Sequence, residues 1–99
     1  MIDLKSIIEN IVEKEDKNLV DIILEIVTKI KTLPKNTKTT ISKLIDFKPE
    51  KTVIDPLKQG KIFRYVRLVC KEININLEQL NKNFGGLAYH YEFKIILKK

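Results

Sequence analysis

The sequence has very few of the residues that build disulfides, metal centres and nucleophilic sites. Among its 99 residues there is one cysteine, Cys70, and one histidine, His90. A single cysteine cannot form an intramolecular disulfide, and one residue of each kind argues against a zinc site or a Cys–His nucleophile. We therefore expect no metal and no cofactor, and a reducing, cytoplasmic setting for the thiol.

The sequence also lacks phosphate loops, long apolar runs and paired catalytic carboxylates. Gly85 and Gly86 belong to neither a GxGxxG nor a GK[ST] pattern. No run of about 18 apolar residues is present, so we expect no membrane span. Met1 leads into an amphipathic segment containing Asp3 and Glu9, which does not resemble a signal peptide. Because the acidic residues are scattered, we expect a binding protein and not an enzyme.

The composition is that of a small globular domain with an uneven charge distribution. Hydrophobic residues make up 43% and charged residues 32%, values that exclude a disordered chain. Residues 1–33 hold five lysines against seven acids, whereas residues 34–99 hold fourteen lysines or arginines against six acids. The excess of positive charge therefore lies in the C-terminal two-thirds, and the whole chain has a net charge of +6. This division predicts that one part assembles and the other binds an acidic partner.

Residues 55–73 predict an amphipathic basic helix. Asp55 is a good N-cap and Pro56 suits the first helical position, although Gly60 leaves a start at Lys61 as an alternative. One face is apolar and consists of Ile62, Phe63, Val66, Val69, Cys70 and Ile73. The opposite face carries Lys58, Lys61, Arg64, Arg67 and Lys71, with Tyr65 among them. A helix that packs on the domain with its apolar side and is cationic on the other can bind an anion such as nucleic acid. The alternative is a solvated surface helix.

The N-terminal region predicts a helical hairpin. We expect helices over residues 2–15 and 18–33, with Asp16 or Asn18 capping the second. The apolar stripe of the second helix is wider than one neighbouring helix needs, which indicates two partners. We expect the second partner to be another copy of the chain, unless the C-terminal sheet covers this surface. The predicted dimerisation residues are Leu19, Val20, Ile23, Leu24 and Val27.

The remaining segments predict a short helix and a β-hairpin. Thr39 or Thr40 is expected to cap a helix over residues 41–45. Alternating residues then predict strands over 74–77 and about 88–97. The two strands are joined by a turn over 81–86, whose asparagines and glycines tolerate positive φ. The tip of this hairpin carries Lys82, Asn83 and Phe84.

In this order of elements the chain resembles winged helix-turn-helix proteins. The resemblance covers residues 37–97 and rests on the segments TTISKLI, KIFRYVRLVCKEI and NINLEQL–NKNFGG–LAYHYEFKIIL. It implies a winged helix-turn-helix with a C-terminal β-hairpin wing. Together with the N-terminal helical hairpin predicted above from periodicity, we expect an α+β fold. With the dimerisation residues predicted above, we expect residues 1–33 to dimerise and residues 34–99 to bind DNA, within one compact domain. More narrowly, the chain is similar to relaxosome accessory proteins of clostridial conjugative plasmids, which implies a dimer at a plasmid transfer origin that assists a relaxase.

We therefore expect a sequence-specific binder of double-stranded DNA, either an accessory protein at a transfer origin or a small transcriptional regulator. The expected DNA-binding residues are Lys38, Lys43, Lys58, Lys61, Arg64, Tyr65, Arg67, Lys71, Lys82, Asn83 and Phe84. Two alternatives remain open. One is a protein-interaction module, an adaptor or inhibitor, that uses the basic helix on an acidic partner. The other is a single-strand binder in which Phe84, Tyr89 and Tyr91 stack on bases.

Overall fold

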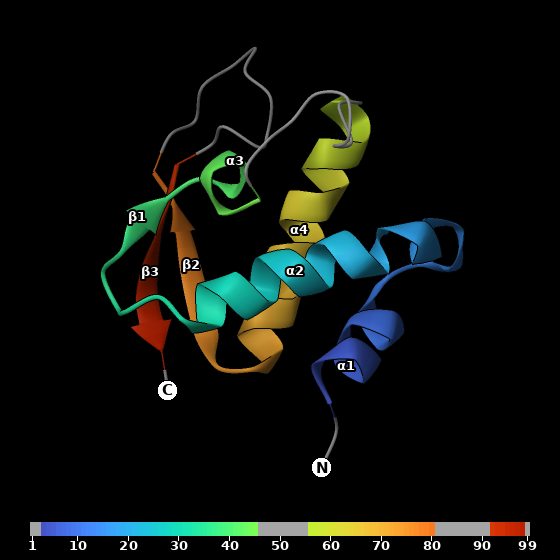
Figure 1. Cartoon of the computed structure of the whole chain (residues 1–99), viewed down its shortest axis with the longest axis horizontal. Helices are drawn as coiled ribbons and strands as arrows, with labels where there is room; N and C mark the ends of the chain where they lie inside the picture. The colour runs from blue at the N-terminus through green and yellow to red at the C-terminus, as the bar shows by residue number, and fades with distance from the viewer. Residues whose placement is uncertain (1–2, 46–55, 81–91, 99) are drawn as a thin grey trace.

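The chain folds into a group of helices packed against a small antiparallel sheet, which confirms the expected α+β class (Figure 1). The computed structural model describes residues 3–45, 56–80 and 92–98. In chain order the elements are α1 (Leu4–Ile11), the 3-10 helix η1 (Lys14–Leu19), α2 (Val20–Lys31), β1 (Lys38–Thr39), α3 (Ile41–Leu44), α4 (Pro56–Glu72), β2 (Ile75–Gln79) and β3 (Phe93–Lys98).

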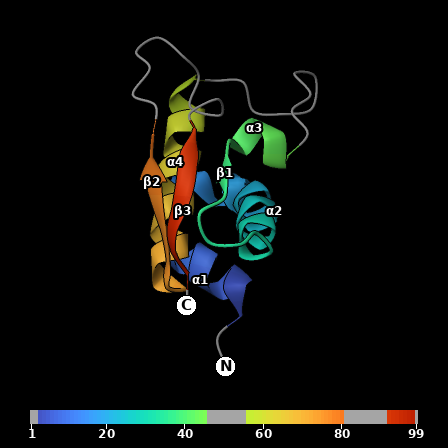
Figure 2. The ribbon, with the colours of Figure 1, turned by 90° about the vertical axis from the view of Figure 1, so that its left-hand side faces the viewer.

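The sheet has the strand order β1-β3-β2, and both pairings are antiparallel. Leu77 of β2 lies opposite Ile95 of β3, and the register shifts between Asn76 and Leu77. On the other side of β3, Thr39 of β1 lies opposite Phe93. The sequence did not predict β1, because two polar residues show no alternating pattern. Figure 2 shows β2 and β3 lying over α4.

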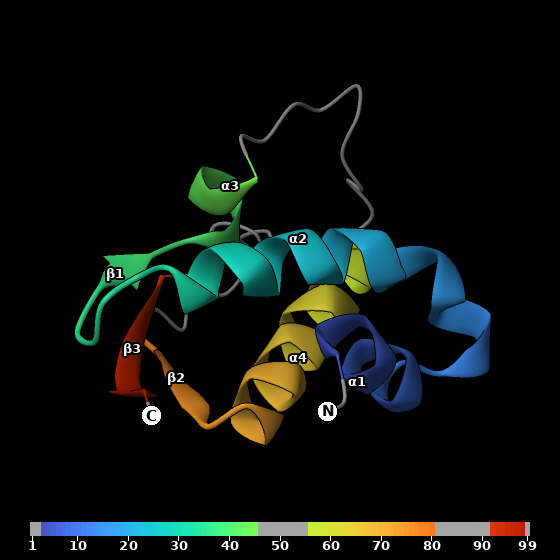
Figure 3. The same ribbon diagram turned by 60° about the horizontal axis from the view of Figure 1, so that its bottom comes forward.

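One hydrophobic core unites the N-terminal helices with the C-terminal elements. Helix α2 crosses α4, and α1 lies beside both (Figure 3). The predicted apolar face of α4 is confirmed at Ile62, Phe63, Val66, Val69 and Cys70, which are all buried. Ile73, also predicted on this face, lies just after the helix ends at Glu72 and is partly buried. They pack with side chains from α1, α2 and the sheet, among them Ile8, Ile23, Ile26, Ile30, Phe93 and Ile95.

The first two helices are shorter than predicted. Helix α1 ends at Ile11 because Val12 has extended backbone angles, φ −73° and ψ 132°. The polar corner that follows forms η1, and α2 begins only at Val20. Neither Asp16 nor Asn18 caps α2, because its N-cap is Leu19, which makes no side-chain cap.

Local polar contacts fix several of the other boundaries. The Asp3 carboxylate accepts a hydrogen bond from the Ser6 backbone N–H at 2.8 Å and caps α1. The Thr40 hydroxyl accepts one from Lys43 N–H at 3.2 Å and caps α3. Asn74, predicted as the start of a strand, instead has φ 66° and ends α4, so β2 begins at Ile75. Helix α4 runs through Gly60 without a break.

The predicted dimerisation surface is wrong. Leu19, Val20, Ile23 and Val27 are buried in the core of a single chain, and Leu24 is partly buried against it. The apolar stripe of α2 does have more than one partner, as its width indicated. Those partners are α1, α4 and α3 of the same chain, so the stripe leaves no broad apolar face for a second copy.

Two further points depend on which residues the structure describes. No helix among them is long and apolar enough to cross a lipid bilayer. The predicted hairpin turn over 81–86, with Lys82, Asn83 and Phe84, lies outside the described residues, as do Tyr89, His90 and Tyr91.

Candidate nucleic-acid interface

Helix α4 exposes a cationic face on the side opposite to the core. Arg64, Arg67 and Lys71 are all exposed, at spacings of three and four residues that place them along one side of the helix. This outer face of α4, defined here by Gly60, Arg64, Arg67, Leu68 and Lys71, borders the sheet. The core-facing residues Ile62, Tyr65, Val66, Val69 and Cys70 form the inner face.

The outer face forms one wall of a groove with a volume of about 630 Å³. The strands supply the opposite wall, with Asn76, Leu77 and Gln79 from β2 and Ile96 from β3. All five outer-face residues and Phe63 line the α4 side. The groove therefore combines cations, amides and apolar side chains, a mixture found where proteins contact nucleic acid bases.

The cations of the groove are not neutralised by the part of the chain that the structure describes. In residues 3–45, 56–80 and 92–98, no acidic side chain forms an ion pair with Arg64, Arg67 or Lys71. The Arg64 guanidinium lies 5.7 Å from the centre of the Tyr65 ring, a contact that leaves its hydrogen-bond donors available. Cations without an ion-pair partner among the described residues therefore line the groove, where they could attract an anionic ligand.

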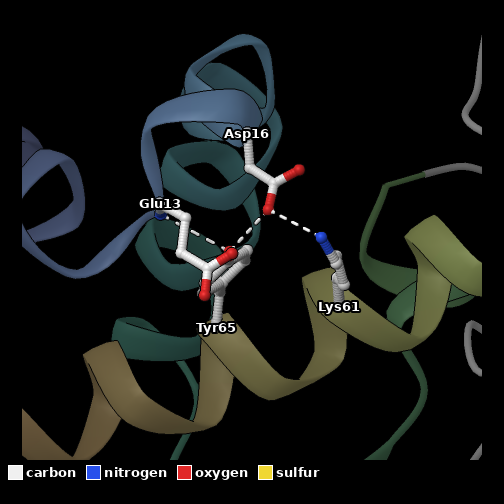
Figure 4. A network of polar contacts seen from close by, with 4 residues as sticks. All are labelled: Glu13, Asp16, Lys61 and Tyr65. Carbon is white, nitrogen blue, oxygen red and sulfur yellow. Dashed lines mark hydrogen bonds and ion pairs between the residues drawn. The ribbon is translucent and has the colours of Figure 1, made fainter.

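Lys61 has a different environment, because it pairs with Asp16 of η1. Its Nζ lies 3.2 Å from Asp16 Oδ2. The same oxygen accepts a hydrogen bond from the Tyr65 hydroxyl at 2.6 Å, and that hydroxyl accepts one from the Glu13 N–H at 3.4 Å. Figure 4 shows Asp16 pointing down from η1 toward both side chains of α4. This network anchors the corner between α1 and α2 onto α4.

Burial and hydrogen bonding shift the proton affinities in this network. The pKa of Tyr65 is raised, first because its hydroxyl is buried and second because it donates to Asp16. The pKa of Lys61 is also raised, because its ammonium group donates to the Asp16 carboxylate and is attracted by its charge. Lys61 therefore stays protonated, but its charge is compensated within the protein.

Tyr65 was expected on the exposed cationic face, and this expectation is wrong. Its side chain is only 2% exposed, and the ring belongs to the core. Tyr65 lies at the border between the polar and apolar arcs of α4, and η1 covers it by offering Asp16 as an acceptor. A buried tyrosine with a satisfied hydroxyl stabilises the fold and is not available to stack on a ligand.

The other expected DNA-binding residues are distributed over the molecule. Lys38 is exposed on β1, at the edge of the sheet opposite to β2, and Lys43 is exposed on α3. Neither lines the groove. Lys58 belongs to α4, but its side chain is outside the described part, like the whole of the 81–91 segment. The structure thus brings Arg64, Arg67 and Lys71 together at the groove, which neither Lys38 nor Lys43 lines.

Several groove residues were missed from sequence, and only one of them left a signal. Asn76, Gln79 and Ile96 are brought to α4 by the sheet, whose register a helical pattern cannot reveal. Leu68, in contrast, interrupts the cationic arc of α4 with an apolar side chain that is 45% exposed. An apolar residue that departs from the amphipathic pattern of a helix can indicate a contact with a partner.

Three carboxylates gather at the η1 corner. Oxygens of Glu13, Glu15 and Asp16 lie within 4.8 Å of one another. Asp16 already accepts hydrogen bonds from Tyr65 and Lys61, so we regard the cluster as part of the anchor between η1 and α4.

Comparison of the chain with protein-family models, curated proteins and solved structures gives no match. The functional argument therefore rests on the groove and its chemistry.

Proposed function

We propose that this protein binds double-stranded DNA with the outer face of α4. The observation that supports this most directly is the contrast among the cations of α4. Lys61 is compensated by Asp16, whereas Arg64, Arg67 and Lys71 border a groove without an ion-pair partner among the described residues. Arginine side chains can bond bidentately to guanine edges, and lysines bind phosphates.

The order of the elements supports the same proposal. Helices α3 and α4 follow one another as in a helix-turn-helix, and β2 and β3 follow α4 as a wing would. The first strand, β1, pairs with β3 and completes a three-stranded sheet. In such an arrangement the second helix, here α4, enters the major groove and the hairpin contacts the neighbouring backbone or minor groove.

The test is a titration of the protein with short labelled duplexes over a series of salt concentrations. Wild-type affinity should fall linearly on a log–log plot as salt rises, because bound cations displace counterions from the phosphates. Arg67→Ala and Lys71→Ala should each reduce that slope by about one unit if they contact a phosphate. Lys5→Ala removes the same charge from the exposed surface of α1 and should leave the slope unchanged.

Affinity that does not depend on salt, or groove variants that behave like Lys5→Ala, would contradict the proposal. A single strand that binds more tightly than its duplex would favour the single-strand alternative. The resemblance described above makes a plasmid transfer origin and a promoter the two kinds of site to examine first.

A second candidate is supported by the apolar residues in the groove. Leu68 and Ile96 are 45% and 40% exposed, and both line it beside the cations. An acidic amphipathic segment of another protein would match this combination of charge and apolar surface. Acidic peptides that compete with the duplex, together with weak duplex binding, would favour this function over DNA binding.

A further inference from the structure

Leu68 lies where a phosphate-binding surface has no need for an apolar side chain. It follows Arg67 directly, and on the helix it lies one turn after Arg64 and nearly one turn before Lys71. It is 45% exposed and does not belong to the buried core cluster, which α4 reaches through its inner face. A lysine or glutamine would be equally compatible with the helix at this position.

Leu68 shares the groove with a second apolar residue and two amide-bearing residues. Ile96 of β3, 40% exposed, lines the same groove, as do Asn76 and Gln79 of β2. A ligand that enters it meets apolar atoms from both the helix and the sheet, with cations along one side. The apolar group that duplex DNA presents in its major groove is the C5 methyl of thymine.

We propose that Leu68 is a specificity-determining residue that packs on a thymine methyl, which rests on the proposed function of duplex binding. Arg64 and Leu68 are four residues apart, or about 6 Å along the helix axis. Base pairs are stacked about 3.4 Å apart. The preferred site should therefore contain a thymine within about two base pairs of a guanine bound by Arg64.

The experiment removes the methyl group and nothing else from the DNA. Sites that bind the full-length protein are first selected from randomised duplexes. The best duplex is then compared with a copy in which deoxyuridine replaces each thymine in turn. For wild type, one of these replacements should weaken binding about threefold to fourfold, the effect expected for one buried methyl group.

Variants connect that preference to Leu68. Leu68→Ala should bind the thymine and uracil duplexes equally, and Leu68→Met, which retains an apolar side chain, should keep part of the preference. Leu80→Ala is the matched control, because Leu80 is similarly exposed at 37% but does not line the groove. It should retain the full preference. Thermal unfolding of each variant verifies that the fold is intact.

The outcomes separate this inference from the proposed function. Salt-dependent duplex binding by wild type without any loss at uracil would overturn the role of Leu68 and leave the proposed function standing. A methyl preference that survives in Leu68→Ala would also overturn it. The absence of salt-dependent duplex binding would overturn both.

Discussion

The two faces of α4 differ in whether the rest of the chain covers them. On the inner face, Ile62, Val66, Val69 and Cys70 are at most 1% exposed and are fully packed by the same chain. The outer face consists of exposed cations, Gly60 and Leu68, which line a groove that the described chain leaves open. The inner face thus supplies buried apolar surface that stabilises the fold, and the outer face presents cations and Leu68 to any ligand. Substitutions on the two faces should therefore have separable effects.

The largest effect is expected from the inner face. Ile62→Ala should lower the free energy of unfolding by about 2–5 kcal/mol, because it leaves a cavity among fully buried side chains. Urea denaturation measures this change. Leu68→Ala on the outer face is the control and should change stability by less than about 0.5 kcal/mol. Equal losses for the two variants would contradict the division of α4 into two faces.

The division of α4 could be predicted from sequence because a helical period needs only local information. The apolar residues Ile62, Phe63, Val66, Val69 and Cys70 recur at the helical spacing and are buried as expected. Tyr65 could not be placed in this way, since its burial depends on η1. The path of η1 depends on the extended backbone at Val12, which ends α1 early.

The prediction for α2 shows a second limit of sequence patterns. The width of its apolar stripe correctly indicated several partners, but a pattern does not reveal which chain provides them. Here α1, α3 and α4 all pack on α2 within one molecule. The groove is a non-local feature of the same kind, because Asn76, Gln79 and Ile96 reach α4 only through strand pairing.

The next largest effect is expected where the inner face meets η1. Tyr65→Phe keeps the buried ring and removes the hydroxyl that donates to Asp16 at 2.6 Å. Losing a hydrogen bond to a buried carboxylate should cost about 1.5–3 kcal/mol. A double-mutant cycle with Asp16→Ala, measured by urea denaturation, isolates the coupling between the two side chains. A variant as stable as wild type would show that the contact does not anchor η1.

Alkaline pH should lower the free energy of unfolding through Cys70, which lies on the inner face. Burial raises the pKa of its thiol from 9.0 to about 12, so the folded chain holds this proton more tightly than the unfolded chain. The stability that the protonated thiol contributes is therefore fully present below pH 9 and is lost as the pH rises from about 9 toward 12. At pH 10.5 the loss from this group should be roughly 2 kcal/mol, at 1.36 kcal/mol per unit of pKa.

Urea denaturation between pH 7 and pH 10.5 measures this loss, and Cys70→Ala is the control. The raised pKa values of Tyr65 and Lys61 act in the same direction, so the variant should still lose some stability. Its decline should be shallower than that of wild type. An identical pH dependence in wild type and variant would mean that the thiol does not contribute to the loss of stability at alkaline pH.

A small gain in stability is expected from the outer face at Gly60. This glycine lies inside α4, and a Cβ atom built there meets no atom within 4 Å. Gly60→Ala should therefore raise the free energy of unfolding by about 0.5–1 kcal/mol, because alanine loses less backbone entropy in a helix. Thermal and urea unfolding measure the gain. A destabilised variant would show that the outer face needs the flexibility of glycine at this position.

The smallest effect concerns Lys61, which lies between the two faces and is compensated by Asp16. Asp16→Asn keeps an oxygen that can accept from the Tyr65 hydroxyl but removes the charge that holds Lys61. The lysine side chain is 39% exposed, so it should become available to a phosphate beside Arg64. In the salt series, the slope for duplex binding should then become steeper by about one unit. Asp21→Asn adds the same net charge on the exposed surface of α2 and should leave the slope unchanged. If the two variants have equal slopes, Lys61 does not reach the duplex, and Arg64, Arg67 and Lys71 remain the proposed DNA contacts on the described part of α4.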